Sequence, residues 1–373
     1  MKKIKVLVVD DSALIRALFS DMLKADPNIE VVDTANDPIE ARSKIKQHNP
    51  DVITLDIEMP KMDGITFLEK LMRLHPMPVV MISSHTQKGA ECVMRCLQIG
   101  AVDFMPKPVS NNDDSLSIYA SNLVAKVKAA SQANFAKHIQ ISESSTLNKT
   151  KNGKPIHDIK EPDKLDCNTN IRLVAIGSST GGTEALAKLI PDIPTDFPPI
   201  VITQHIPSKF SKAFAERLDR NCAVKVVEAQ DGDEIKAGHV YIAPGGKQME
   251  VVKYKYNLMC KVFDGEKVNR HCPSVEVLFK SVANVVGKKV ISVMLTGMGD
   301  DGSAAMQDIK NTGAITIAQD EKSSVVWGMP GTAVKLGCID RVISLEKIAD
   351  ELISICRDNS SNSLSNLRSA ASS

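Results

Sequence analysis

Two regions of the chain alternate short apolar runs with amphipathic stretches. In the first, residues 1 to about 130, the apolar runs predict five strands, over residues 5–9, 30–35, 51–57, 79–83 and 102–105. Helical patterns lie between these strands and after the last one, including residues 120–136. Strict alternation of strands and helices predicts a (βα)5 unit with a parallel, doubly wound sheet. Ligands of such sheets bind beyond the carboxyl ends of the strands.

The alternation resumes at residue 171 and continues to about residue 357. Strands are expected over 171–176, 199–203, 224–228, 239–243, 290–295, 314–319 and 339–343, and helices over 183–190, 209–218, 275–286, 304–311 and 345–356. Residues 249–264 alternate in a way that favours an antiparallel hairpin appended to this sheet. The second region therefore predicts another doubly wound, mostly parallel sheet with an antiparallel hairpin.

The segment between these regions has a different composition. Residues 142–170 are rich in Ser, Asn, Lys, Glu and Pro and contain no aromatic residue. Such a segment buries too little apolar area to offset its ordering entropy. We expect a domain over residues 1–130, a linker over 131–169, a second domain over 170–357 and a disordered tail over 358–373.

Polar side chains gather at the predicted strand ends of the first domain. Asp10 and Asp11 follow the first strand, Asp56 ends the third, Ser83 ends the fourth, and Lys107 follows the fifth. Converging carboxylates repel one another, and Mg²⁺ with its preference for oxygen ligands relieves that repulsion. One aspartate could then accept a phosphoryl group held by the lysine and the serine. The alternative, that each aspartate only caps a helix or turn, explains single residues better than the whole set.

These residues make the first domain resemble the receiver domain of bacterial response regulators. The resemblance implies a Mg²⁺-dependent phosphorylation site. By this resemblance the metal is bound by Asp10, Asp11, Asp56 and the backbone carbonyl of Glu58, and Asp56 accepts the phosphoryl group. The residues implied to respond to phosphorylation are Ser83, Phe104 and Lys107.

A tight turn opens the second domain. Residues 177–181 read Gly-Ser-Ser-Thr-Gly, the G-x-S-x-G spacing of a nucleophile elbow, between a buried strand and a helix. The helix N-terminus would direct free backbone N–H groups at an oxyanion. The spacing favours Ser179 as the nucleophile, but it does not exclude the adjacent Ser178. A phosphate-binding or purely structural turn is the alternative.

Possible partners for the serine follow two other strands. His205 comes after the strand at 199–203, and Asp300 and Asp301 come after the strand at 290–295. A serine needs a histidine to take its proton, and a carboxylate fixes the histidine tautomer. A loop histidine and helix-capping aspartates remain alternatives. The order Ser, His, Asp differs from the Ser, Asp, His order of α/β-hydrolases.

That order and three motifs resemble the chemotaxis protein-glutamate methylesterase/glutaminase (CheB) family. The motifs are Ile-Gly-Ser-Ser-Thr-Gly-Gly at 176–182, Thr-Gln-His at 203–205 and Leu-Thr-Gly-Met-Gly-Asp-Asp-Gly at 295–302. The resemblance implies Ser179 as nucleophile, His205 as general base and Asp301 as its orienting carboxylate. Backbone N–H groups of Thr180 and Met298 are candidate oxyanion donors.

The chain departs from that family pattern at three positions. Ser178 stands where alanine is usual, Asp300 where asparagine is frequent, and Cys272 where arginine is common. The first two place a second candidate beside the expected catalytic residue. The segment 269–275 resembles a further family signature, and the resemblance leaves its substrate-binding role open because Cys272 replaces the usual arginine.

The family implies a phosphorylation-activated serine esterase. It would hydrolyse glutamate γ-methyl esters on chemotaxis receptors, and deamidate receptor glutamines, in chemotactic adaptation. The expected partners are the receptors and a chemotaxis histidine kinase as phosphodonor. Mg²⁺ serves the receiver, and no cofactor is expected for ester hydrolysis.

The composition and charge of the chain limit its possible partners and classes of function. There are 46 Lys plus Arg and 45 Asp plus Glu residues, so the charge gives no support for a nucleic-acid partner. The cysteines are scattered and lack a C-x-x-C pair, which is typical of reduced thiols. The N-terminal residues lack the apolar core of a signal peptide, and no run of about 20 apolar residues could span a membrane. We therefore expect a cytoplasmic protein. A receiver with a DNA-binding output and a nucleotide-binding module are the rivals. Salt-dependent DNA binding would favour the first, and thermal protection by nucleotide the second.

Overall fold

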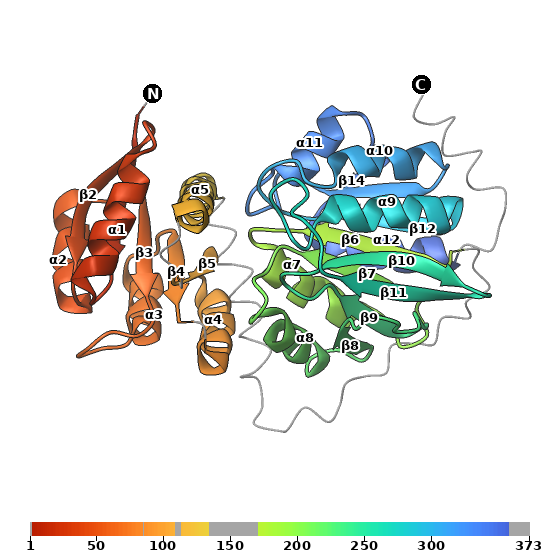
Figure 1. Cartoon of the computed structure of the whole chain (residues 1–373), viewed down its shortest axis with the longest axis horizontal. Coiled ribbons are helices and arrows are strands. Elements are labelled where there is room, and N and C mark those ends of the chain that lie inside the picture. The colour runs from red at the N-terminus through yellow and green to blue at the C-terminus, as the bar shows by residue number, and fades with distance from the viewer. Residues whose placement is uncertain (1, 85, 109–112, 134–170, 358–373) are drawn as a thin grey trace.

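The computed structural model describes residues 2–84, 86–108, 113–133 and 171–357, which form two α/β domains side by side (Figure 1). The expected tail over 358–373 lies outside the described residues, and so does the expected linker apart from residues 131–133. The domain boundaries therefore stay predictions. None of the helices described is both long and apolar enough to cross a membrane.

The first domain is a parallel sheet of five strands in the order β2-β1-β3-β4-β5. Its strands are β1 (Ile4–Val9), β2 (Ile29–Ala35), β3 (Val52–Asp56), β4 (Val79–Ser83) and β5 (Asp103–Pro106). Its helices are α1 (Ala13–Lys24), α2 (Pro38–His48), α3 (Gly64–Leu74), α4 (Gln87–Ile99) and α5 (Asp113–Gln132). The predicted (βα)5 unit is confirmed. Helix α5 begins earlier than residue 120 and packs Leu116 and Tyr119 against the core.

Local sequence explains where these helices begin. The side chains of Ser12, Asp37, Asp63 and Thr86 each accept a backbone N–H from the first turn of the helix that follows. Such caps satisfy donors that have no partner within the helix. The strands alternate between two apolar cores because successive side chains point to opposite faces. Helices α1 and α5 cover one face, and α2, α3 and α4 cover the other.

The second domain is a parallel sheet of seven strands in the order β14-β13-β12-β6-β7-β9-β8. They are β6 (Leu173–Ser178), β7 (Ile200–Gln204), β8 (Lys225–Glu228), β9 (His239–Ile242), β12 (Val290–Met294), β13 (Ile315–Gln319) and β14 (Arg341–Ile343). The helices are α7 (Gly182–Leu189), α8 (Ser211–Asp219), α9 (Val275–Val285), α10 (Ser303–Asn311), α11 (Met329–Lys335) and α12 (Leu345–Arg357), with short 3-10 turns at Ile190–Asp192 and Gly287–Lys289.

The hairpin differs from the expectation in its attachment. Strands β10 (Gln248–Tyr254) and β11 (Asn257–Phe263) pair in antiparallel register but form a separate sheet of two strands. Its apolar face, with Met249, Val251 and Cys260, joins the core beneath α9 instead of continuing the parallel ladder. The hairpin was therefore predicted correctly, and its addition to the main sheet was wrong.

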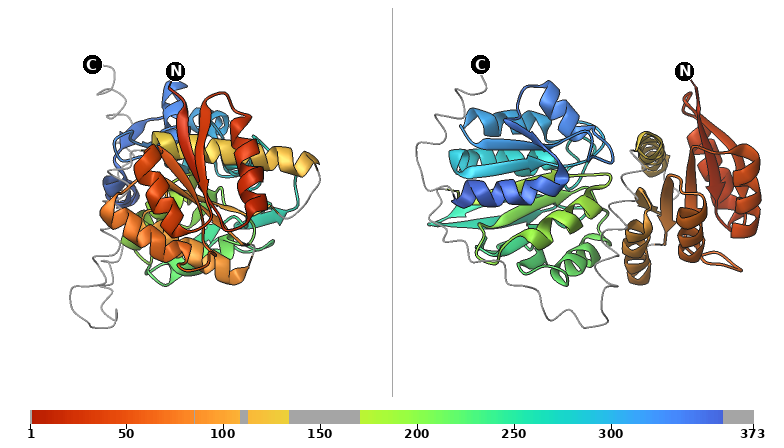
Figure 2. Two further views of the ribbon diagram at one scale, coloured as in Figure 1. Left: turned by 90° about the vertical axis from the view of Figure 1, so that its left-hand side faces the viewer. Right: turned by 180° about the vertical axis from the view of Figure 1, so that it is seen from behind.

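The strand order places a topological switch point beside β6. From β6 the chain moves to β7 on one side and later returns to β12 on the other, so both strands pair with β6. Helices α7, α8 and α12 cover one face of this sheet, and α9, α10 and α11 cover the other. Loops after β6, β7 and β12 therefore meet at one carboxyl edge, where α/β sheets bind ligands. This edge faces the first domain, which lies in front of it in the left view of Figure 2.

Candidate active site

The turn after β6 depends on glycine. Gly181 has φ +78°, a left-handed conformation, and a Cβ there would lie 2.7 Å from the Val325 side chain. A Cβ at Gly182 would lie 2.2 Å from Gln204 Oε1. Ser179 N donates to Thr296 O at 3.0 Å, which ties the turn to the loop after β12. The chain can therefore pass from buried strand to helix at this point while Ser179 stays at the edge of the sheet.

The two adjacent serines have different environments. Ser178 is fully buried, and its hydroxyl donates to Gln204 Oε1 at 2.6 Å. Ser179 is partly exposed, and its Oγ lies 3.1 Å from His205 Nδ1. Of the two serines, Ser179 is therefore the one whose hydroxyl lies beside a histidine.

His205 links Ser179 to a buried carboxylate. Its Nε2 lies 2.8 Å from Asp301 Oδ2, and the side chains of His205 and Asp301 are 7% and 2% exposed. With the proton on Nε2, this nitrogen donates to Asp301, and the Nδ1 lone pair can accept the Ser179 hydroxyl. Asp300, the other candidate, is exposed and makes no such contact among the described residues.

Asp301 is held by several donors besides His205. Ser274 Oγ at 2.8 Å and Asn269 Nδ2 at 2.9 Å donate to Oδ1, and the Val275 backbone N–H donates to Oδ2 at 2.7 Å. Burial alone would raise the pKa of Asp301, but His205 and these donors stabilise the charged form and lower it below its usual range. The carboxylate is therefore ionised and fixed at the N-terminus of α9, where a negative charge is favoured.

Thr180 and Met298 lie in the loops after β6 and β12, and their backbone N–H groups are the candidate oxyanion donors. Neither backbone N–H has a protein acceptor within the described ranges. The backbone N–H groups of the preceding residues already have acceptors, since Ser179 N donates to Thr296 O and Gly297 N donates to Val326 O. The two free N–H groups remain the candidate oxyanion donors.

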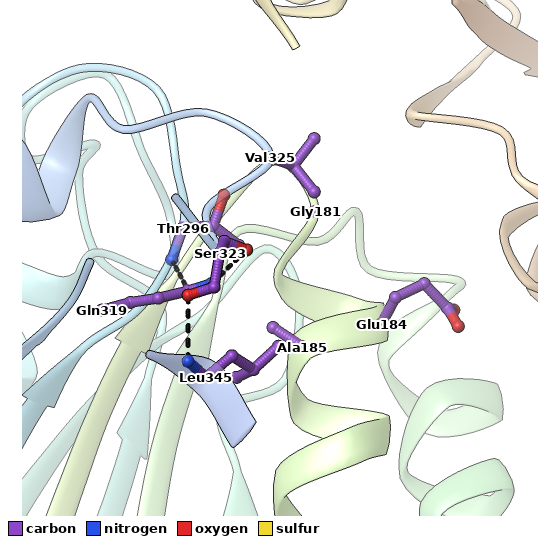
Figure 3. Close-up of a pocket in the computed structure, with 8 residues that line it drawn as sticks. All are labelled: Gly181, Glu184, Ala185, Thr296, Gln319, Ser323, Val325 and Leu345. Carbon is purple, nitrogen blue, oxygen red and sulfur yellow. Dashed lines mark hydrogen bonds between the residues drawn. The ribbon is translucent and has the colours of Figure 1, made fainter. Parts of the chain in front are cut away.

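A network of buried polar groups stabilises the loops that contact the turn after β6. Thr296 N donates to Gln319 Oε1 at 2.8 Å, and Gln319 Nε2 donates to Ser323 O at 2.8 Å. Leu345 N completes the network by donating to Ser323 Oγ at 2.9 Å. Figure 3 shows these side chains around a small pocket that also contacts Gly181. The loops after β6, β12 and β13 are thus fixed relative to one another.

Sequence reasoning did not single out four residues of this site. Gln204 holds Ser178 and the Ser179 carbonyl, Asn269 and Ser274 hold Asp301, and His271 stacks on His205. The last three belong to the segment 269–275, for which a substrate-binding role was left open because of Cys272. Its resemblance to a family signature was the signal that pointed to this segment.

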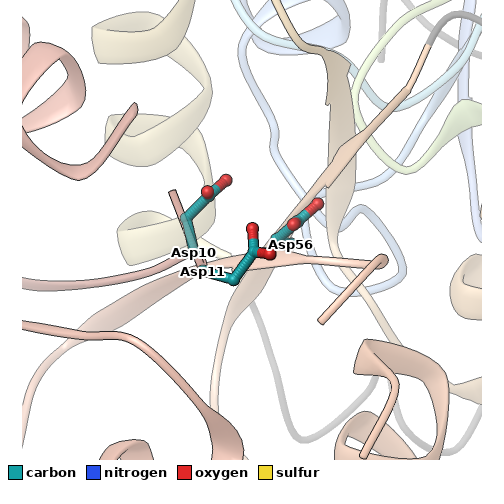
Figure 4. A group of neighbouring side chains, drawn as sticks. All are labelled: Asp10, Asp11 and Asp56. Atoms are coloured by element: carbon teal, nitrogen blue, oxygen red, sulfur yellow. The ribbon is translucent and has the colours of Figure 1, made fainter. Parts of the chain in front are cut away.

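The first domain brings its three aspartates together. Asp10, Asp11 and Asp56 each place a carboxylate oxygen within 4.8 Å of the others (Figure 4). Lys107 Nζ lies 2.8 Å from Asp56 Oδ2 and 3.0 Å from Asp10 Oδ2. Burial raises the pKa of Asp56 to about 6, and Lys107 opposes this. Asp56 Oδ1 is buried with no hydrogen-bond partner, so this carboxylate fits a Mg²⁺ ligand and phosphoacceptor.

The expected switch residues occupy different positions around this cluster. Ser83 is buried, and its hydroxyl donates to the Ser84 and Gly89 carbonyls at 3.2 and 3.4 Å rather than to Asp56. The Glu58 side chain accepts from Ser84 Oγ at 2.9 Å. Phe104 is buried in β5 and packs against Phe210 of the second domain, with ring centroids 4.7 Å apart.

The receiver-like domain covers the edge that carries Ser179. Besides Phe104–Phe210, Thr180 Oγ1 donates to Asp103 Oδ2 at 2.6 Å, and Arg217 donates to Met94 O at 3.5 Å. A cleft of about 600 Å³ remains beside Met298, between Gln132 of α5 and Trp327. Access to the candidate catalytic residues is therefore restricted in this arrangement.

Comparisons with known proteins agree with both halves of this description. Residues 6–117 match the family model for the response regulator receiver domain, and residues 174–352 match the CheB methylesterase model. A protein-glutamate methylesterase/protein-glutamine glutaminase of Hydrogenovibrio crunogenus is 45% identical, covering 96% of this chain and 100% of that protein. One from Saccharophagus degradans is 49% identical, over 95% and 99%. The crystal structure of the Thermotoga maritima CheB methylesterase catalytic domain is 38% identical, covers 50% of this chain and 98% of its own, and has a TM-score of 0.49.

Proposed function

The chain belongs to the CheB methylesterase family, and from this premise we propose that it is a phosphorylation-activated protein-glutamate methylesterase and glutaminase. Its substrates are glutamate γ-methyl esters and particular glutamines on the helical cytoplasmic region of chemotaxis receptors. Its products are methanol or ammonia and the receptor glutamate. The reaction would reset receptor signalling in the cytoplasm.

One observation carries this proposal: the continuous contact from Ser179 Oγ through His205 to Asp301, at 3.1 and 2.8 Å. His205 Nδ1 takes the hydroxyl proton as Ser179 attacks the ester carbonyl carbon. Asp301 stabilises the imidazolium that forms. The Thr180 and Met298 N–H groups stabilise the oxyanion, a contribution typically worth about 10²–10³ in rate per donor.

The second half of the reaction uses the same groups. The imidazolium gives its proton to the methoxide oxygen as the ester C–O bond breaks, so methanol departs and the acyl group stays on Ser179. A water molecule that loses its proton to His205 then attacks the acyl carbonyl. The bond to Ser179 Oγ breaks, His205 returns the proton to this oxygen, and the glutamate is released. A glutamine substrate follows the same course with ammonia as the leaving group.

Phosphorylation of Asp56 provides the regulation in this proposal. Asp10, Asp11, Asp56 and the Glu58 carbonyl would hold Mg²⁺, whose charge would offset that of the phosphoryl group donated by a chemotaxis histidine kinase. Phosphate at Asp56 would recruit Lys107 and Ser83 and thereby alter the packing of Phe104 on Phe210. Phosphorylation can shift the equilibrium between the docked and the released domains only by the difference in the interaction free energy of the phosphate between these two states.

Methanol release from radiolabelled, methylated receptor membranes tests the function. Ser179→Ala should lose roughly 10⁴-fold or more in rate, because it removes the nucleophile. Ser178→Ala is the matched control and should keep most of the activity. A small phosphodonor should stimulate the wild type and Ser178→Ala alike.

The other outcomes are equally informative. If Ser178→Ala were the inactive variant, the choice of nucleophile would be wrong while the reaction class survived. If the phosphorylated wild type released no methanol from a competent receptor, the esterase proposal would fail and the second domain would have to be regarded as a binding module.

A further inference from the structure

The imidazole ring of His271 lies flat against the ring of His205. The ring centroids are 3.6 Å apart and the planes differ by 7°. His271 belongs to neither the Ser179–His205–Asp301 chain nor the receiver interface contacts described above. It lies in the turn that precedes α9, closed by hydrogen bonds between Val268 and His271 at 2.9 and 3.0 Å.

The turn that carries His271 has an unusual backbone. Asn269 and Arg270 are consecutive non-glycine residues with left-handed φ values of +50° and +71°. Such conformations are unfavourable and persist where surrounding contacts maintain them. Here the turn presents Asn269 Nδ2 to Asp301 Oδ1 at 2.9 Å and the His271 ring to His205. One short segment therefore contacts both the histidine and its carboxylate.

The hydrogen bonds of His205 leave one motion unrestrained. Ser179 and Asp301 contact the ring at its two nitrogens, where hydrogen bonds are strongest in the plane of the ring. The ring can tilt about the line that joins these partners with little change in either distance. A flat neighbour in van der Waals contact opposes that tilt, because tilting pushes one ring edge into it.

We propose that His271 is a positioning residue for the esterase reaction, which holds the His205 ring in the plane where Nδ1 faces Ser179 Oγ and Nε2 faces Asp301. This inference rests on the proposed function and adds a residue to it. His271 exchanges no proton in the reaction; it acts only through the face of its ring.

The charge state of His271 is consistent with this role. Burial and the neighbouring His205 lower the pKa of His271 to about 3, with Lys126 and Arg270 acting in the same direction and Asp301 against it. The ring is therefore neutral at the pH where the enzyme works. A neutral ring can remain stacked when His205 becomes an imidazolium, whereas a charged one would repel it.

Three full-length variants test the proposal with methylated receptor as substrate. His271→Ala removes the flat face, and His271→Phe replaces it with another aromatic ring. His239→Ala is the matched control, because His239 stacks on Tyr241 at the start of β9, away from the carboxyl edge. The readouts are kcat, KM, and the NMR chemical shifts of the His205 ring protons in the phosphodonor-free protein.

We expect kcat of His271→Ala to fall roughly tenfold to a hundredfold with little change in KM, as misplacement of a reacting group predicts. Loss of the stacked ring would also remove its ring current from the His205 ring protons, so their NMR signals would move. His271→Phe should retain kcat within about threefold, because an aromatic face remains in contact with His205. His239→Ala should resemble the wild type throughout.

Two results would overturn the positioning role while wild-type activity stands. One is His271→Ala with wild-type kcat and unshifted NMR signals of the His205 ring. The other is a folded His271→Phe as inactive as His271→Ala, because that would assign His271 a hydrogen-bonding or proton-transfer role. If His271→Ala fails to fold, His271→Gln replaces it, with the same expectations. Absence of activity in the wild type would instead contradict the proposed function, and the NMR signals of the His205 ring would still test the contact.

Discussion

Thr180 donates its hydroxyl hydrogen bond to the carboxylate of Asp103 across the domain interface, at a distance of 2.6 Å between buried atoms. Thr180 directly follows Ser179, and Asp103 directly precedes Phe104. Lys126 of α5 completes the contact with Asp103 Oδ1 at 2.7 Å. The strand that carries the expected switch aromatic and the turn that carries the expected nucleophile therefore share one hydrogen bond.

Thr180→Val should raise activity in the absence of phosphodonor. Valine keeps the shape of the side chain and the backbone N–H but removes the hydroxyl. A hydrogen bond to a charged group contributes about 1.5–3 kcal/mol, so the docked arrangement should weaken by about tenfold or more. Methanol release without and with phosphodonor measures this effect.

The matched control for that variant is Thr66→Val. Thr66 also donates to an aspartate, Asp63 at 2.9 Å, but this bond is exposed and lies within the first domain. Its removal should leave the unstimulated rate unchanged. Equal unstimulated rates for Thr180→Val and wild type would show that the Thr180–Asp103 bond does not hold the domains together.

Asp56→Asn should stabilise the first domain in a pH-dependent manner. Burial raises the pKa of Asp56 from 3.8 to about 6, so the folded state binds the proton more tightly than the unfolded state does. Wild-type stability should therefore fall as pH rises from about 4 to about 6, and the variant should escape this loss. Thermal unfolding in Mg²⁺-free buffer should show little advantage at pH 4.5 and up to about 3 kcal/mol at pH 7.5, the equivalent of two pKa units.

Adding Mg²⁺ to the same samples provides the control. The ion should stabilise the wild type at pH 7.5 more than Asp56→Asn, because the variant lacks one of the clustered carboxylates. An advantage of Asp56→Asn that is the same at both pH values would contradict the raised pKa.

Gly181→Ala should destabilise the second domain by about 2–4 kcal/mol, since left-handed strain and overpacking add together. The new Cβ would meet Val325 at 2.7 Å in addition to the strain at φ +78°. Gly232→Ala is the matched control, because its φ is +84° and no heavy atom lies within 4 Å of the added Cβ. It should cost about 1 kcal/mol from strain alone. Equal losses in urea titrations of the two variants would show that the contact with Val325 relaxes freely.

Glu184→Gln should be among the more damaging changes away from Ser179. Glu184 and Arg217 form a bidentate pair at 2.8 and 3.0 Å, with side chains only 2% and 6% exposed. The variant leaves a buried guanidinium without its counter-charge, which typically costs about 3 kcal/mol or more. Urea unfolding measures the loss.

Glu69→Gln is the control for that ion pair. Glu69 accepts from Arg95 at 2.7 Å, but the side chains are 45% and 62% exposed. An exposed pair contributes about 1 kcal/mol or less. A loss in Glu184→Gln as small as that in Glu69→Gln would mean that water reaches Arg217 readily.

Much of the fold could be predicted from periodicity. The apolar runs at 79–83 and 290–295 correctly predicted buried strands, because parallel strands that are covered on both faces are continuously apolar. Helix α11 was missed, because its seven residues, with Pro330 and Gly331, give too short a pattern. The attachment of the hairpin was wrong, because alternation identifies a strand pair and not the surface against which it packs.

The sequence by itself determined the candidate chemistry of this protein. Motif spacing and the family resemblance indicated Ser179, His205 and Asp301 with Ser178 and Asp300 as alternatives, and the strand ends indicated the aspartate cluster, because residue types at strand ends reflect the local turn and the sheet that follows from alternation. The tertiary structure decided which of two serines faces His205, which of two aspartates is buried against it, and that His271 stacks on His205. Those are contacts between loops far apart in the chain, and their geometry depends on strand order and packing that no local pattern specifies.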